Sequence, residues 1–145
     1  MPFRLRLAGS ALGAWLLAAT LAGGAQTDPN DPLGLGTKLG IQTLNNSGQL
    51  GFITLFGRGS HKTLVDLTMS GVPRSKVELA SLRRGRDCSG KIDRKIAFVL
   101  GDVRNGRSGT LLAASEATLL SGNYITIVAS KETPSHYLAC GHLYR

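Results

Sequence analysis

Hydrophobic and polar residues alternate over short stretches of this 145-residue chain. In the segment 63–70, Val65, Leu67 and Met69 alternate with polar neighbours, and the segment 124–130 shows a similar pattern. A period of two directs one side of a β-strand toward a core and the other side toward water. The second side of segment 124–130 is only partly polar, which favours a central strand.

Seven short segments of this kind are predicted to be strands. They are rich in β-branched, leucine and aromatic residues, and clusters of Gly, Pro, Asn or Ser separate them. Their ranges are 49–56, 63–70, 76–82, 95–100, 110–117, 124–130 and 136–143. Because only the segment 115–121 could form a helical turn, the pattern predicts an all-β domain built as a sandwich or a barrel.

The N-terminal residues have the composition of an export signal. Arg4 and Arg6 precede an apolar stretch, 11–22, and small residues occupy positions 23–25. This order predicts a signal peptide over residues 1–25 and a secreted or periplasmic protein with no transmembrane segment after cleavage. A membrane anchor is the alternative, but the uncharged stretch 7–25 is rich in alanine and glycine, is barely long enough to span a bilayer, and leads into polar residues.

The residues that follow the signal divide into two parts. Residues 26–40 are rich in proline and glycine and are predicted to be a flexible linker, so the folded domain is expected to occupy residues 41–145. Without Arg4 and Arg6, the 17 basic residues fall to 15 against 9 acidic ones, which is a formal charge of +6. An exported protein with this charge is expected to bind an anionic cell-envelope component or a protein partner.

Two cysteines, Cys88 and Cys140, are present in the chain. In an oxidising compartment two cysteines have one possible pairing, and they are expected to form a disulfide bond. Bonded sulfur atoms cannot act as a nucleophile or a metal ligand. The disulfide prediction therefore removes the strongest candidates for catalysis.

Several short motifs resemble a known family. They are 71–73, 80–85 leading to Cys88, 105–108, 119–124 and the closing segment 137–141. Together they look like the copper–zinc superoxide dismutase fold, and more closely like its shorter secreted relatives and the chordin-type (CHRD) domain. The resemblance implies a Greek-key β-sandwich or flattened barrel in which one disulfide ties a loop to the last strand.

The same resemblance implies that the metal chemistry of the family is missing. The positions of its copper-binding histidines correspond to Ser81, Arg83 and Ala129, and none of these side chains can ligate copper. Tyr137 stands where the family holds an arginine near the last cysteine. We therefore expect no metal, no cofactor and no catalytic residue.

Basic residues concentrate around the first cysteine. The predicted anion-binding patch consists of Arg83, Arg84, Arg86, Lys91, Arg94 and Lys95. Arginine side chains on an ordered loop can hold phosphate or carboxylate groups with two hydrogen bonds each. The alternative is a solvated loop whose charges only keep the protein soluble. The region holds no aromatic residue between Val72 and Ala97, which argues against a specific nucleic-acid interface.

Three functions remain open at this point. The leading hypothesis is a non-enzymatic secreted binding or structural module on a degenerate dismutase-like scaffold, with the basic loop contacting an anionic surface or partner. The alternatives are a metal-binding enzyme of the dismutase type and a CHRD-type protein-interaction domain. Fold resemblance alone does not transfer an activity.

Overall fold

The computed structural model describes residues 34–145. The expected signal peptide, 1–25, and the first part of the expected linker, 26–33, lie outside these residues. The described chain forms nine strands and one short helix. They are β1 (Thr37–Thr43), β2 (Leu50–Gly57), β3 (Thr63–Ser70), β4 (Val77–Arg84), β5 (Ile96–Val99), β6 (Val103–Arg104), β7 (Arg107–Leu112), α1 (Glu116–Leu119), β8 (Tyr124–Ser130) and β9 (Tyr137–His142). No helix among residues 34–145 is long and apolar enough to cross a membrane.

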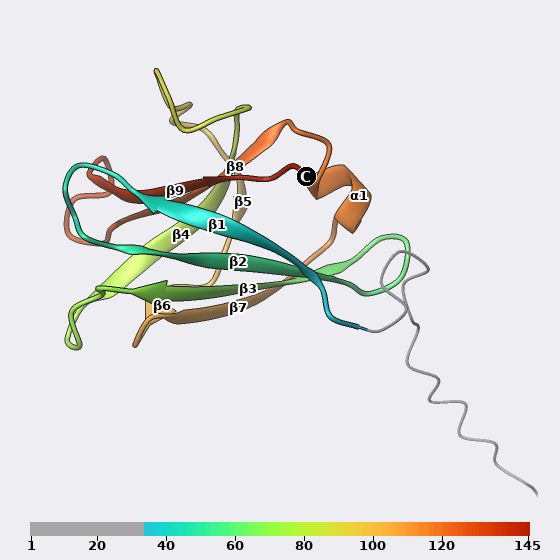
Figure 1. The fold of residues 1–145 in the computed structure, drawn as a ribbon, viewed down its shortest axis with the longest axis horizontal. Helices are drawn as coiled ribbons and strands as arrows, with labels where there is room; N and C mark the ends of the chain where they lie inside the picture. The colour runs from blue at the N-terminus through green and yellow to red at the C-terminus, as the bar shows by residue number, and fades with distance from the viewer. Residues whose placement is uncertain (1–33) are drawn as a thin grey trace, which may run out of the picture.

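Eight of these strands form a closed antiparallel barrel. Their order around the ring is β4-β6-β7-β3-β2-β1-β9-β8, and the pairing of β8 with β4 closes it. β5 lies outside the ring and pairs with the second half of β4, whereas β6 pairs with its first two residues. Figure 1 shows α1 and the C-terminus together at one end of the barrel. The prediction of an all-β domain is confirmed, and of the two architectures that the sequence left open, a sandwich and a barrel, the structure has the barrel.

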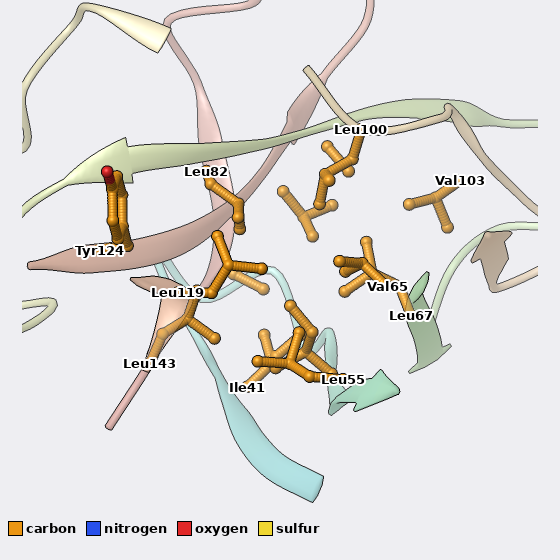
Figure 2. Close-up of a cluster of buried hydrophobic side chains, with 14 of the residues drawn as sticks. Ile41, Leu55, Val65, Leu67, Leu82, Leu100, Val103, Leu119, Tyr124 and Leu143 are labelled. Carbon is orange, nitrogen blue, oxygen red and sulfur yellow. The ribbon is translucent and has the colours of Figure 1, made fainter. Parts of the chain in front are cut away.

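Apolar side chains from the inward faces of the strands fill the barrel. Val65, Leu67 and Met69 of β3 are buried, as their alternation predicts. Figure 2 shows the side chains that converge in this core, and its labelled members are Ile41, Leu55, Val65, Leu67, Leu82, Leu100, Val103, Leu119, Tyr124 and Leu143. Removing this surface from water is the main contribution to the stability of such a domain.

β8 is buried on both of its faces. One face packs into the barrel, and the other carries Ile125, Ile127 and Ala129 in a second apolar cluster with Cys140. Partly buried Ile92, from the connection between β4 and β5, packs against the same cluster. This connection therefore covers the outside of β8 and β9, and the expectation that 124–130 is a central strand is confirmed.

Three elements differ from the sequence-based expectation. β1 begins at Thr37, inside the expected linker, because it pairs with β2 on one side and β9 on the other. The expected strand 110–117 is instead the end of β7 followed by α1, whose first turn is capped by Ser115 accepting a hydrogen bond from Thr118 N. β6 has only two residues, which is too short for alternation to reveal.

Candidate functional site

The disulfide predicted from the sequence is present. Cys88 and Cys140 are joined with an S–S distance of 2.07 Å and a Cα–Cα distance of 5.9 Å. Cys140 lies in the fully buried part of β9, whereas Cys88 lies in the connection between β4 and β5. The bond therefore anchors this connection, residues 85–95, to the wall of the barrel. We call this connection, together with Arg84 at the end of β4, the basic loop (residues 84–95).

Arg83 does not belong to the exposed patch in which the sequence places it. Its side chain is buried, and its guanidinium donates hydrogen bonds to the carbonyl oxygens of Asp93 (3.1 Å) and Arg94 (3.0 Å) and to the hydroxyl of Tyr137 (3.0 Å). Its Nε also donates to Ser81 Oγ at 3.3 Å. Arg83 therefore holds the far end of the basic loop against the barrel instead of facing solvent.

The other five basic residues of the predicted patch are exposed. They are Arg84, Arg86, Lys91, Arg94 and Lys95. Within residues 34–145 the salt bridges involve other cations, and none of these five has an acidic partner. Arg84 lies over the Tyr124 ring, with 5.5 Å between its Cζ and the ring centroid, and it also lines a surface hollow with Lys91 and Arg94.

The two acidic residues of the basic loop shape its backbone. Asp87 Oδ1 accepts hydrogen bonds from Ser89 N at 3.0 Å and Ser89 Oγ at 2.7 Å, and Asp93 Oδ1 accepts from Lys95 N at 2.9 Å. The bonds from Ser89 are the main reason that the pKa of Asp87 lies below its usual range, with a smaller contribution from the charge of Arg86. Neither acid forms a salt bridge within residues 34–145, although Arg86 is close enough to Asp87 for its charge to be felt.

The three positions that the sequence resemblance assigns to copper ligands, Ser81, Arg83 and Ala129, come together in space. All three line one small pocket of about 110 Å³, to which Ile96 and Val99 of β5 also contribute. Neither a hydroxyl, a guanidinium nor a methyl group offers the imidazole nitrogen that copper prefers. Within residues 34–145 no group of three His, Cys, Asp or Glu side chains is arranged to hold a metal ion.

A second polar site lies near the start of β4, and the sequence analysis missed it. Glu78 is 3% exposed and Gln49 is 4% exposed, and Gln49 Nε2 donates a hydrogen bond to Glu78 Oε1. The other oxygen of each side chain, Glu78 Oε2 and Gln49 Oε1, has no hydrogen-bond partner within residues 34–145. Burial raises the pKa of Glu78, and the bond from Gln49 opposes the shift only in part.

A sequence signal for this site existed. Side chains two residues apart in a strand lie on the same face, so Glu78 shares the face of β4 that carries Ala80 and Leu82, which are both buried in the core. An acidic residue on the inward face of a strand is unusual, because burial of a carboxylate is costly without a partner. Its partner Gln49 comes from the turn before β2 and could be found only in the fold.

The Gln49–Glu78 pair lies in a pocket of about 380 Å³. The turn before β2, the β3–β4 connection and the β8–β9 hairpin all contribute to it, and Figure 1 shows these three connections at the same end of the barrel. Its lining residues are Gln49, Pro73, Ser75, Lys76, Val77, Glu78, Ser130, Lys131, Glu132, His136 and Leu138. We call this the Gln49–Glu78 pocket.

The cations at the rim of this pocket are paired. Lys76 Nζ lies 2.8 Å from Glu132 Oε1, and Lys131 Nζ lies 3.0 Å from Asp102 Oδ2. Among residues 34–145, Glu78 is therefore the one acidic group lining the pocket without a cationic partner. The basic loop has the opposite arrangement. Its five exposed cations form no salt bridge within residues 34–145, and its two acids accept hydrogen bonds from Ser89 and Lys95.

Comparisons with known proteins add no relative to this picture. No protein-family model matches the chain, and a search of curated proteins finds no match. The resemblance to the dismutase and CHRD families therefore rests on the short motifs in the sequence. The function has to be argued from the two sites themselves.

Proposed function

We propose that this protein is a non-enzymatic secreted binding module that holds anionic groups of a cell-envelope component on its basic loop. The observation that carries this proposal is a set of five exposed cations on one anchored segment that form no salt bridge within residues 34–145: Arg84, Arg86, Lys91, Arg94 and Lys95. An ordinary surface intersperses both signs of charge, whereas a segment with one uncompensated sign attracts anions.

Anchoring supports the proposal because an ordered loop loses less entropy when it binds. The Cys88–Cys140 bond fixes the middle of the basic loop, and Arg83 fixes its end through two backbone carbonyls. The guanidinium groups of Arg84, Arg86 and Arg94 can each offer two parallel hydrogen bonds to a phosphate or carboxylate. Preorganisation of this kind increases affinity without additional contacts.

A degenerate dismutase-like barrel as the scaffold is part of this proposal, and the order of the strands supports it. The chain leaves β3, returns to the ring at β4, and then runs through β6 and β7 to lie beside β3 again. This order supports a Greek-key assignment, in which a fourth strand returns beside the first of three consecutive ones. Ser81, Arg83 and Ala129 lie together around one pocket but carry no metal-ligand chemistry, which favours binding over catalysis.

A salt-dependent binding assay tests this function. We expect R84S/R86S/R94S to elute from a column of immobilised heparin, used as a polyanion probe, at lower salt than the parent, and to sediment less with a cell-envelope preparation. R58S/K62S/R104S is the matched control, since it removes three exposed cations from other parts of the barrel. Equal weakening by the two variants would show that net charge alone is responsible and would contradict the proposal.

The outer edge of β5 favours a second candidate function, a CHRD-type protein interaction. β5 lies outside the closed ring, and Val99 is 71% exposed while Ile96 is 44% exposed. An uncovered strand edge can add a strand from another chain. If this edge binds a protein, V99K should abolish capture of that protein from the envelope preparation, and binding should resist salt concentrations that release the parent from heparin.

A further inference from the structure

Two buried oxygen atoms of the residues that line the Gln49–Glu78 pocket have no hydrogen-bond donor in the described part of the chain, residues 34–145. They are Gln49 Oε1 and Glu78 Oε2, and they belong to side chains that are already joined to each other. A buried polar atom without a partner costs stability, and such atoms are rare in folded proteins. Two unsatisfied acceptors in the same pocket indicate that a donor from outside the chain completes the site.

The charge of the pocket selects the kind of donor. Glu78 is the acid without a cation, because Lys76 and Lys131 are held at the rim by Glu132 and Asp102. A cationic N–H group gives the strongest hydrogen bonds to a carboxylate, and it also compensates the cost of burying that charge. A nitrogen that carries at least two hydrogens can satisfy both acceptors at once.

The lining of the pocket indicates which group is attached to the donor nitrogen. Pro73, Val77 and Leu138 contribute apolar surface to the same lining as Gln49 and Glu78. The volume of about 380 Å³ accommodates a short alkyl chain. Binding sites of this size are usually apolar with a few convergent polar groups.

We propose that the Gln49–Glu78 pocket binds an alkylguanidinium or alkylammonium group, with the nitrogen donating to Gln49 Oε1 and Glu78 Oε2 and the alkyl chain against Pro73, Val77 and Leu138. Such a group occurs in free small amines and in arginine or lysine side chains of a peptide. The site is separate from the basic loop and opposite to it in the charge that it accepts.

Titration calorimetry of the folded protein with butylguanidinium and butylammonium tests the proposal. We expect both cations to bind, and neutral butanol not to bind. E78Q keeps the size of the side chain but removes its charge, and it should weaken cation binding at least about tenfold, as expected for loss of a charge-assisted hydrogen bond. E116Q is the matched control, because Glu116 is also buried with an unpartnered oxygen but lies in a different pocket, beside Arg145. It should bind as the parent does.

Two further arms keep the test decisive. S75W places a bulky ring at an exposed position of the pocket lining and should block binding even if E78Q does not fold. A short peptide with a single arginine separates the two sources of the cation: tighter binding than butylguanidinium indicates a side chain, and weaker binding indicates a free amine. R84S/R86S/R94S should bind butylguanidinium normally, so a failure of the basic-loop function leaves this result unaffected.

The proposal is overturned if the parent binds neither cation at concentrations on the order of 10 mM, where even a weak specific site is partly filled. It is also overturned if E78Q and the parent bind butylguanidinium equally. Equal binding of butanol and butylammonium would show an apolar hollow without recognition of charge.

Discussion

The two ends of strand β4 differ in how their charged side chains are buried and paired. Glu78 and Arg84 are six residues apart, roughly 20 Å at about 3.3 Å per residue. At the first end an acid is buried without a cation, and the nearby lysines are paired with other acids. At the second end Arg84 and the other cations of the basic loop are exposed without acidic partners.

This difference shows that the number of charges in a region says less about function than their burial. An exposed cation is solvated by water and costs little stability, so a cluster of them can persist without any role. A buried carboxyl with an unpartnered oxygen does cost stability, and its presence calls for a specific explanation. The basic loop is conspicuous in the sequence, but the Gln49–Glu78 pocket is the stronger physical signal.

The largest expected effect comes from the bond that anchors the basic loop. Cys88 and Cys140 are 52 residues apart, so loss of the bond in C88A/C140A should lower the free energy of unfolding by about 4 kcal/mol in the loop-entropy model. Chemical denaturation of the parent and the double variant measures this difference. A decrease below about 1 kcal/mol would contradict the model and show that the outer apolar cluster holds the loop on its own.

The neighbours Arg83 and Arg84 give the next largest effect and a matched pair. Arg83→Met removes the donor to Tyr137 and to two loop carbonyls, and we expect a loss of about 1.5 to 3 kcal/mol in unfolding free energy. Arg84→Met removes an exposed charge, and its effect should remain within about 0.5 kcal/mol. Equal effects in chemical denaturation would contradict the difference in burial between the two side chains.

The pH dependence of the unfolding free energy tests the end of β4 that carries Glu78. The pKa of Glu78 is raised above 4.5 in the folded protein, so between 4.5 and the raised value the folded state binds more protons than the unfolded state. Its stabilising contribution is therefore complete below pH 4.5 and is lost as pH rises through the folded pKa. Unfolding free energies measured against pH should fall less steeply over this range in E78Q than in the parent.

Glu132 provides a control of opposite sign for this measurement. The hydrogen bond from Lys76 and the charge of Lys76 lower its pKa below 4.5. Its stabilising contribution is present above pH 4.5 and is lost as pH falls through the lowered pKa. E132Q should therefore leave the slope above pH 4.5 unchanged. If E132Q flattened that slope as much as E78Q does, burial of Glu78 would not be its cause.

The smallest expected effect is that of the basic loop on stability. R84S/R86S/R94S should change the unfolding free energy by no more than about 0.5 kcal/mol per substitution, since exposed charges without partners contribute little. Thermal melting at low and high salt measures this. A marked destabilisation at both salt concentrations would show that these arginines have a structural role, as Arg83 does.

Much of the fold could be predicted because its signals are local. The strands over residues 63–70 and 124–130 have the predicted bounds, and the pairing of Cys88 with Cys140 follows from their number and the expected compartment. β1 was missed because its first half lies in the segment 26–40, whose proline and glycine content predicts a linker, and only its pairing with β2 and β9 makes it a strand. The same limit applies to the sites, where the basic residues are visible in the sequence but their exposure is not.

The sequence by itself determined the β architecture, the excess of positive charge and the one possible disulfide, because periodicity, composition and cysteine count do not depend on distant contacts. Only the tertiary structure decided that Arg83 is buried while Arg84 is exposed, since that depends on which face of β4 the basic loop covers. It also brought Gln49 to Glu78, 29 residues away, by placing the turn before β2 beside the start of β4. Burial and hydrogen bonding arise when distant segments meet, so these properties belong to the folded chain.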